Sequence, residues 1–559
     1  MFENFVYKIL ESKKNKLIVI VLTAIAFFAS LLMFPTKAVL AKMLPGKSDN
    51  TYSIYVDTPT GSSIEETKKV TSCIVDILKK EQEILNISIF YAQGIPLDYA
   101  GLVKGSSMKQ TENVAEISVN LTDKHSRKEP SFLMTQRLRP IINEKCSNLV
   151  PDSKIKMIEQ PAGPPTLASI VVEVHGENIE QSRQLAIEVS EILASTKGLV
   201  DVDVMADDIY DKYKLIPNKE KIARSGLTVK QVNNILYLAF EGMVIASKNS
   251  ADKSDQIPIF LVLSDETKRL SSSNEDALRS KLSSLNLMNM QGMMVPLSEV
   301  VEIQKVKSTP MIMHKNLSRM INVIAETDMV SQVYPLLDAR DTMIKQFSDR
   351  YDIKKAGFST YMFDLYLTDK QTGEEFLLRW DGEMKVTLDT FRDLGAAFIA
   401  ALVLIFFLLV IYYKSFTLSG IVLLGSFLSL MGVIAGHWVA DLVTEQTFFL
   451  TATSLIGFIA LMGISSRNSL LLIDFAKSLI DEGVEKKRAI AHAAATRAKP
   501  IMLTAVAIIL GSALLASDPV FGGLGVALIS GTVAAVFVSL LFIPILMDNA
   551  KAMEKQKEE

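Results

Sequence analysis

The apolar residues of this chain are concentrated at its two ends. Leu17–Phe34 is an apolar run of 18 residues, and no comparable run follows before Leu394. Five further runs then follow at Leu394–Tyr413, Leu418–Ala435, Phe448–Ala476, Pro500–Ser517 and Gly522–Met547. A helix of about 20 residues crosses the roughly 30 Å hydrocarbon core of a bilayer, so each run is long enough. The pattern predicts six transmembrane helices, one before and five after a large outer region.

Lysine and arginine predict the orientation of these helices. Four lysines precede the first run, and six basic residues lie between the fourth and fifth runs, whereas His437–Thr447 and Asp518–Gly522 contain none. Because basic connections stay in the cytoplasm, we expect both termini inside the cell and residues 36–392 outside the membrane. The first run is longer than the apolar stretch of a signal peptide, so we interpret it as an uncleaved anchor.

The outer region alternates strand and helix patterns, which predicts an α+β fold. In its first part we expect strands at Tyr52–Thr58, Ile87–Tyr91, Val114–Leu121 and Lys154–Glu159, with helices from Ser63 and over Ser131–Ser147. Ser63 and Glu66 have the spacing of a capping box at a helix start. This βαββαβ order is typical of a ferredoxin-like unit.

A second round follows the hinge Gly163-Pro164-Pro165, and a long insertion interrupts it. We expect its strands at Ser169–His175, Val200–Val204, Ile321–Glu326 and Phe358–Leu367, with helices over Ile179–Ser195 and Val333–Phe347. The insertion, near Asp208 to Glu302, contains helical patterns at Lys219–Arg224 and Val229–Ala239 and a strand pattern at Ile257–Leu263. The outer region should therefore hold one intact and one interrupted ferredoxin-like unit.

Composition excludes several classes of protein. The 559 residues are 49% hydrophobic and 22% charged with a formal net charge of −3, which excludes a generally basic nucleic-acid binder. No Gly-rich phosphate loop, nucleophile elbow or carboxylate pair indicates catalysis, and the five histidines lack the spacing of metal ligands. We therefore expect no enzyme, no cofactor and no metal site. Cys73 and Cys146 lie at offset positions on their predicted helices, which argues against a disulfide between them.

One arginine lies deep inside a predicted transmembrane helix. The fourth run contains Arg467, with Asp474 two helical turns further along. An arginine at this depth costs at least ~2.5–3.5 kcal/mol on insertion scales and marks a functional site by default. Two helical turns rise by roughly 11 Å, which is far for a direct ion pair between Arg467 and Asp474. The other five apolar runs contain no Asp or Glu in their interior. The acid that balances Arg467 is therefore expected from another chain, and pairing with Asp474 is the alternative.

Several motifs together resemble the C-terminal half of resistance–nodulation–division (RND) efflux transporters. They are GISSRNSLLLIDF at Gly463–Phe475, RAKPIMLTAVAIILG at Arg497–Gly511, PNKEKIARSG at Pro217–Gly226, VPLSEV at Val295–Val300 and WDGE at Trp380–Glu383. The resemblance implies a trimeric inner-membrane pump that uses the proton-motive force to export drugs, other amphiphiles or cations. Such a pump works with a periplasmic adaptor and an outer-membrane channel.

The resemblance also implies a division of the chain. Residues 1–36 would form the cytoplasmic N-terminus and first helix, 37–165 a periplasmic porter subdomain, and 166–207 with 303–375 a second, split porter subdomain. Residues 208–302 would form an inserted docking subdomain, 376–393 a connector, 394–547 a bundle of five transmembrane helices, and 548–559 a cytoplasmic tail.

Six residues form the proton-relay and ion-pair network that the resemblance implies. Arg467 stands where many members have a lysine that pairs with aspartates of the N-terminal repeat, and Asn468, Arg497 and Thr504 match neighbouring relay positions. Ser466 and Asp474 complete the set. Arginine stays protonated, so we expect Arg467 to act as a counter-ion rather than a proton carrier. This chain lacks the repeat that carries the aspartates, so a separate N-terminal half in the same lipid bilayer is the predicted partner.

Two other functions fit the plan of six helices. Protein-export accessory subunits of the Sec type share one helix, a large outer region and five further helices, but they usually carry their own acidic membrane residue. A non-transporting remnant or interaction subunit of a split pump is the third possibility. Neither alternative predicts a nucleic-acid partner.

Overall fold

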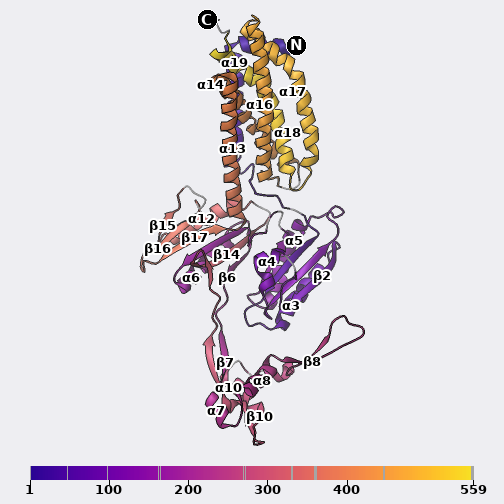
Figure 1. The fold of residues 1–559 in the computed structure, drawn as a ribbon, viewed down its shortest axis with the longest axis vertical. Coiled ribbons are helices and arrows are strands. Elements are labelled where there is room, and N and C mark those ends of the chain that lie inside the picture. The colour runs from indigo at the N-terminus through magenta and orange to yellow at the C-terminus, as the bar shows by residue number, and fades with distance from the viewer. Residues whose placement is uncertain are drawn as a thin grey trace. The chain divides into compact units, whose positions relative to one another are not determined.

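The computed structural model describes residues 2–46, 48–96, 99–160, 163, 165–268, 270, 272, 274–328, 331–357, 362–444 and 447–554. The chain folds into two compact units. Unit 1 contains Met1–Ala206 and Ile312–Glu559, and unit 2 is Asp207–Met311. Figure 1 shows the elements of each unit, and they are described in turn below.

In the described chain, six helical segments are long and apolar enough to cross a membrane, as the sequence predicted. They are α2 (Lys13–Leu32), α13 (Glu383–Tyr413), α14 with α15 (Phe416–Leu428 and Leu430–Val443), α16 (Ala452–Asp481), α17 (Lys486–Ala516), and α18, η3 and α19 (Gly522–Phe537, Val538–Phe542 and Ile543–Asn549). Helix α1 (Phe2–Glu11) precedes them and buries Val6, Ile9 and Leu10. The short turn η4 (Lys551–Met553) follows α19.

The fifth apolar run begins at Pro500, but this proline does not start a helix. It lies inside α17, which begins 14 residues earlier at Lys486. The segment before the proline is rich in alanine, the best helix former, and Ala489, Ala491 and Ala493 are fully buried. Burial of this face stabilises the helix despite the hydrogen bond that proline cannot donate.

The first sheet of unit 1 has four antiparallel strands in the order β2-β3-β1-β4. The strands are β1 (Thr51–Asp57), β2 (Ile84–Tyr91), β3 (Val114–Leu121) and β4 (Lys154–Glu159). Helices α3 (Ile64–Leu78) and α5 (Ser131–Cys146) pack on it, and α4 (Tyr99–Lys104), η1 (Ser106–Met108) and η2 (Ser147–Leu149) are short turns. The capping box is present, because the Glu66 carboxylate accepts from the Ser63 N–H at 2.9 Å. We call residues 48–160 the first sheet domain.

The expectation that the two cysteines stay unpaired is wrong. Cys73 on α3 and Cys146 at the end of α5 form a disulfide, with their Cα atoms 5.7 Å apart. The two helices lie side by side on one sheet face. The position of each cysteine along its own helix does not decide the pairing, because the distance between the two sulfur atoms depends on how the helices pack against each other.

The second sheet of unit 1 has seven strands in the order β13-β14-β5-β17-β16-β15, with β6 also paired to β14. The strands are β5 (Ile170–Gly176), β6 (Leu199–Met205), β13 (Met313–Lys315), β14 (Ser318–Thr327), β15 (Tyr351–Lys355), β16 (Leu365–Asp369) and β17 (Glu375–Asp381). Helices α6 (Ile179–Ser195) and α12 (Val333–Phe347) bury their apolar faces against it. We call residues 165–206 and 312–381 the second sheet domain.

The strand that the sequence predicted at Phe358–Leu367 is not the strand that pairs with β5. Of the expected strand Phe358–Leu367, residues 358–361 lie outside the described residues, and only Leu365–Leu367 belong to a strand, β16. The place beside β5 is taken by β17, which pairs Trp380 with Val172. Periodicity alone did not reveal this long-range pairing.

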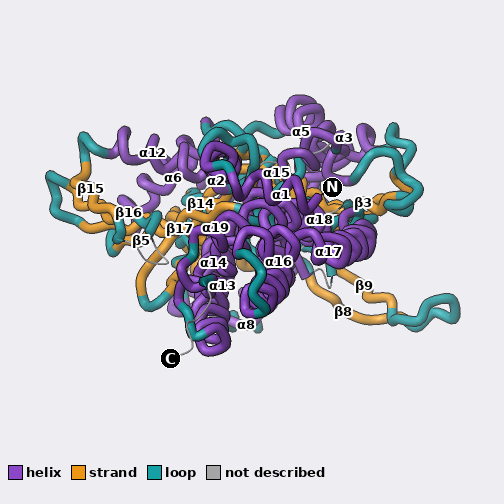
Figure 2. The backbone as a smooth tube through the Cα atoms, turned by 90° about the horizontal axis from the view of Figure 1, so that it is seen from above, coloured by secondary structure: helices purple, strands orange, loops and turns teal. Residues whose placement is uncertain are grey.

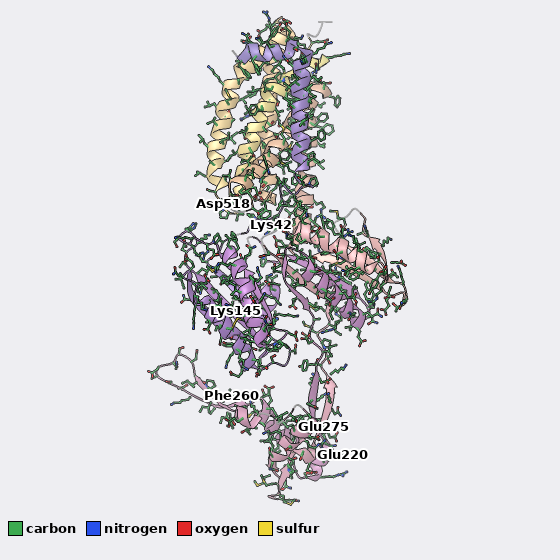
Figure 3. All side chains as sticks on the ribbon, turned by 180° about the vertical axis from the view of Figure 1, so that it is seen from behind. Lys42, Lys145, Glu220, Phe260, Glu275 and Asp518 are labelled. Carbon is green, nitrogen blue, oxygen red and sulfur yellow. A yellow bond between two sulfur atoms is a disulfide. The ribbon has the colours of Figure 1, made fainter. Side chains whose placement is uncertain are left out.

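Unit 2 is built around the antiparallel pair β7 (Asp211–Pro217) and β12 (Val301–Lys307). Its other elements are α7 (Lys219–Arg224), α8 (Val229–Phe240), β8 (Met243–Lys248), β9 (Ile257–Leu261), α9 (Asp265–Lys268), α10 (Glu275–Ser284), β10 (Asn286–Met288), β11 (Met294–Pro296) and α11 (Leu297–Val300). Ile222, Val232, Leu282 and Leu297 form part of its core. Figures 1 and 2 show β8 and β9 as an extended two-stranded ribbon, on which Phe260 is exposed (Figure 3).

Candidate functional site

Helix α16 has one face turned into the bundle and one face that this chain leaves uncovered. The uncovered residues are Ile456, Ala460, Gly463, Arg467 and Leu471. Their spacing of three or four residues places them along a single face of the helix. An alanine and a glycine flank Arg467 on its N-terminal side, and a Cβ added at Gly463 would meet no atom within 4 Å. We call these five residues the open face of α16.

Arg467 lies on the open face and is exposed in the chain as described. It forms no hydrogen bond or ion pair with any described residue. The possible partner on the same helix, Asp474, instead accepts a hydrogen bond from the Tyr412 hydroxyl at 3.1 Å. Within the described part of this chain, Arg467 is therefore a cation in the middle of an apolar helix without a counter-ion.

The predicted neighbours of Arg467 on α16 face the other way. Asn468 is buried, with 6% of its surface exposed, and the Ser466 hydroxyl donates to the carbonyl of Met462. The hydroxyls of Ser465 and Ser469 are also buried and have no partner among the described residues. Residues adjacent in sequence thus divide between two faces of the helix, because each residue advances the side chain by about 100° around the axis.

Helix α17 carries the remaining two predicted site residues. The Arg497 guanidinium lies over the ring of Phe475 on α16, 5.2 Å from its centroid, and its buried Nε has no hydrogen-bond partner among the described residues. The Thr504 hydroxyl donates to the carbonyl of Pro500 at 2.8 Å, which is the self-satisfied arrangement common for threonine in apolar helices. Neither side chain is bonded to Arg467.

A polar depression lies further along α16 from Arg467. It has a volume of about 580 Å³ and is lined by Tyr412, Asp474, Lys477, Ser478, Asp481 and Glu482. Sequence reasoning missed Tyr412. The sequence did contain an indication of this residue, because Tyr412 and Tyr413 end the second apolar run and are its only residues with a hydroxyl group.

A second group that the sequence did not single out surrounds His437 on α15. His437 is fully buried, with Nδ1 2.8 Å from the carbonyl of Val433 and Nε2 2.8 Å from the Ser454 hydroxyl. Because a carbonyl oxygen only accepts, Nδ1 donates to Val433. The network continues from Ser454 to Thr451 and Thr453. Gly523 packs against these hydroxyls so closely that a Cβ would lie 2.4 Å from two of them.

The chain matches the model of a known protein family over almost its whole length. The family is described as the AcrB/AcrD/AcrF family, and the match covers residues 1–360 and 366–548. The chain belongs to this family. The resemblance of the α16 and α17 motifs to RND transporters is therefore confirmed.

Curated members of the AcrB/AcrD/AcrF family with different names are similar to this chain. The swarming motility protein SwrC of Bacillus subtilis is 23% identical over 69% of this chain and 33% of its own length. The nickel and cobalt resistance protein CnrA of Cupriavidus metallidurans is 23% identical over 68% of this chain and 32% of its own length. The multidrug/solvent efflux pump membrane transporter MepB of Pseudomonas putida is 22% identical over 100% of this chain and 48% of its own length.

A solved structure shares the fold. The crystal structure of a heavy metal efflux pump superposes with a TM-score of 0.71 and 17% identity, covering 97% of this chain and 51% of the pump. The chain thus spans about half the length, or less, of the relatives that it matches.

Proposed function

We propose that this chain is the C-terminal half of an RND efflux pump in the inner membrane and works with an N-terminal half supplied by another chain. The observation that carries this proposal is the open face of α16, where Arg467 is exposed and unpaired among the described residues. A buried charge without a partner costs several kcal/mol, so a membrane helix that holds one calls for an acid nearby. The chain's coverage of 51% of a solved family member matches the size of such a half.

The partner would lay a helix along the open face. Ala460 and Gly463 lack bulky side chains, so a second helix can approach closely there, as at other small-residue interfaces in membranes. Carboxylates on that helix would then lie beside the Arg467 guanidinium. Acidic residues in the partner's membrane segment are thus the chemistry that this face recognises.

The proton-motive force would act on this pair. While the partner carboxylates are ionised, Arg467 holds them, and their protonation removes the attraction. Arginine keeps its proton throughout, so Arg467 serves as a counter-ion. Released from the pair, α16 and α17 would shift and transmit the change to the sheet domains. Arg497, stacked on Phe475, would couple the two helices during this shift.

The two sheet domains and unit 2 would have different roles in export. We assign the first and second sheet domains to a periplasmic porter that takes up small molecules, and unit 2 to docking with an outer-membrane channel and its adaptor. Relatives are named for multidrug and solvent efflux and for nickel and cobalt resistance, so drugs, other amphiphiles and cations are the candidate substrates. A trimer of paired halves is the assembly that this assignment requires.

Co-purification from the native membrane tests the proposal. Tagged chain should bring down a second polypeptide that carries intramembrane acids, and Arg467→Ala should abolish this while Arg467→Lys preserves it. Arg488→Ala, which removes an exposed arginine at the start of α17, is the matched control and should have no effect. A chain that purifies only with copies of itself would support the non-transporting remnant instead.

A further inference from the structure

The two sheet domains of unit 1 meet through ion pairs whose signs are segregated. Across this interface Lys104 Nζ lies 2.6 Å from Glu326, and Lys154 and Lys156 each lie 2.5 Å from Asp203. Arg139 reaches two further acids, Asp201 at 3.3 Å and Asp328 at 3.1 Å. Among these described pairs, every cation belongs to the first sheet domain and every carboxylate to the second.

Among the described residues, the two sheet domains have separate apolar cores. The buried apolar residues of the first sheet domain form one cluster, which includes Ile54 and Ile117, and those of the second form another, which includes Val172 and Val323. The two clusters remain separate. Inter-domain contacts of this polar kind are typical of parts that move relative to one another.

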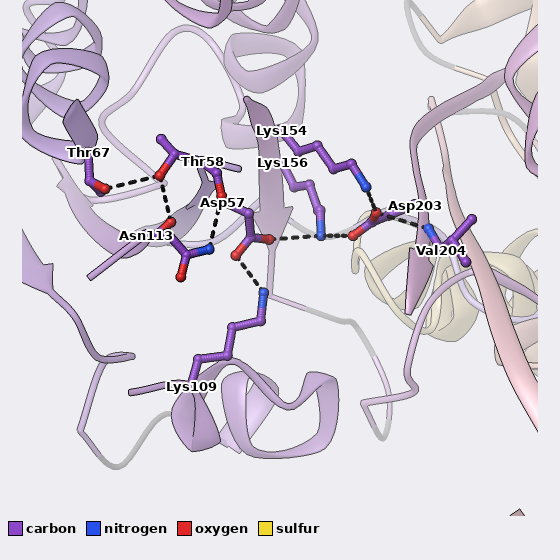
Figure 4. A network of polar contacts seen from close by, with 9 residues as sticks. All are labelled: Asp57, Thr58, Thr67, Lys109, Asn113, Lys154, Lys156, Asp203 and Val204. Atoms are coloured by element: carbon purple, nitrogen blue, oxygen red, sulfur yellow. Dashed lines mark hydrogen bonds and ion pairs between the residues drawn. The ribbon is translucent and has the colours of Figure 1, made fainter. Parts of the chain in front are cut away.

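Two cations of the first sheet domain, Lys156 and Arg139, have a second partner on their own side. Lys156 also contacts Asp57 at 3.2 Å, and Lys109 contacts the other oxygen of Asp57 at 2.5 Å, as Figure 4 shows. Arg139 donates to the Met157 carbonyl at 3.4 Å. If Asp203 moved away, Lys156 would keep a carboxylate and would not be left as an unpaired buried ammonium.

Two acids of the second sheet domain, Asp203 and Glu326, also have hydrogen-bond donors within their own domain. Asp203 accepts from the Val204 N–H at 2.9 Å, and Glu326 accepts from the N–H of Ser169 at 3.1 Å and from its hydroxyl at 2.5 Å. Removing one partner of a buried pair is normally costly because the other charge is left unsatisfied. Here both sides retain hydrogen bonds after separation, which lowers that cost.

We propose that this interface is an electrostatic latch, held shut by Lys154, Lys156 and Asp203 and able to open and reclose while Lys156 and Asp203 each keep a partner on their own side. Opening separates a basic surface of the first sheet domain from an acidic surface of the second. Complementary charge fixes the register in which these two surfaces come together again. The use of this latch in transport rests on the proposed function, whereas its existence does not.

The pKa values agree with ionised partners in the closed state. Burial raises the pKa of Asp203, and the neighbouring Lys156 and Lys154 lower it by more, so it lies below its ordinary range. Burial also lowers the pKa of Lys156, and Asp57 and Asp203 raise it by more, so this lysine stays charged.

Spin-label distance measurements on the full chain in detergent test the latch. Labels at Lys69→Cys on α3 and Ala194→Cys on α6 occupy exposed sites, and the native cysteines are already joined to each other. We expect a longer distance to gain population as salt rises from about 0.05 M to about 1 M, because salt screens exposed and half-exposed pairs. Asp203→Asn should raise that population about threefold or more at low salt.

Two further variants separate the latch from a general loss of structure. Lys154→Gln alters a side chain that is 53% exposed, so it should fold normally and open the interface as Asp203→Asn does. Glu275→Gln removes one charge from an exposed pair inside unit 2 and should change nothing. Identical distances in the unaltered chain, Asp203→Asn and Lys154→Gln at both salt levels would overturn the proposal. No partner chain or transport is needed, so this result is independent of the proposed pump.

Discussion

Two regions of this chain handle charge inside the protein in opposite ways. At the interface of the sheet domains, four cations face four carboxylates, and Lys156 and Asp203 each have a second partner in their own domain. On the open face of α16, one arginine has no partner among the described residues. Among the described residues, the first region pairs its charges within this chain, and we propose that an acid from another chain pairs the charge of the second. The comparison separates charges that the fold satisfies from a charge that assembly would satisfy.

The largest expected effect comes from removing the unpaired cation. Arg467→Ala should weaken binding of the acidic partner by about two to four orders of magnitude, because the partner's carboxylate then stays buried without a counter-ion at a cost of about 3–5 kcal/mol. Competition co-purification at increasing concentrations of untagged chain measures this change. Arg467→Lys keeps the charge and should retain most of the binding. Equal binding by Arg467→Ala and the unaltered chain contradicts the counter-ion role.

Reducing the disulfide should affect the sheet domains and leave the open face unchanged. Loss of the Cys73–Cys146 link frees a long loop in the unfolded state, which lowers the unfolding free energy of the first sheet domain by about 2–4 kcal/mol. Thermal unfolding followed by circular dichroism, with and without reductant, measures this loss, because both tryptophans, Trp380 and Trp438, lie outside the first sheet domain. The double variant Cys73→Ala/Cys146→Ala should behave like the reduced chain and show no further response to reductant.

An acid placed on the open face should supply the missing counter-ion from within the chain. Gly463→Glu puts a carboxylate one turn before Arg467 at a site with open space, the favourable order for a pair four residues apart. Binding of the partner should then fall by about tenfold, the size of a modest polar contact between membrane helices. Gly463→Gln has nearly the same volume without the charge. If both variants lose binding equally, bulk rather than charge is responsible.

Acid pH should loosen the sheet-domain interface and spare the α16 face. The folded-state pKa values of Asp57 and Asp203 lie below the ordinary value, because neighbouring lysines outweigh the effect of burial. Their contribution to stability is therefore fully present above about pH 4 and is lost as pH falls through the folded values. Arginine side chains stay protonated across this range. Label distances across the interface should lengthen as pH falls below about 4, and Asp203→Asn should show a smaller change.

The sequence predicted features that depend on local pattern. The six helical segments and the capping box at Ser63 follow from runs of apolar residues and from a spacing of three. The register of β17 beside β5 and the meeting of Cys73 with Cys146 depend on residues far apart in the chain, and no local pattern encodes them. The start of α17 could not be located from the apolar run, which begins at Pro500. The helix begins earlier because the alanines before the proline are buried in the tertiary structure.

The sequence did not indicate which way the residues of the predicted membrane site face. Sequence placed Arg467, Asn468 and Asp474 on one helix, but a motif of consecutive letters does not say which of them face the bundle. The structure points Asn468 inward and Arg467 outward, and it pairs Asp474 with Tyr412. The absence of an acid for Arg467 could be inferred from sequence, because it required only a search of the apolar runs.

Photo-crosslinking from the open face tests the central claim most directly. A photoreactive residue at Gly463 adds a side chain where this chain offers no neighbour within 4 Å, and the same residue at Gly511 on α17, an equally open site, is the control. Our account predicts that irradiation of native membranes joins position 463, and not 511, to a second polypeptide with acidic residues in its membrane segment. Crosslinking of both positions to lipid alone, or to another copy of this chain, would contradict it.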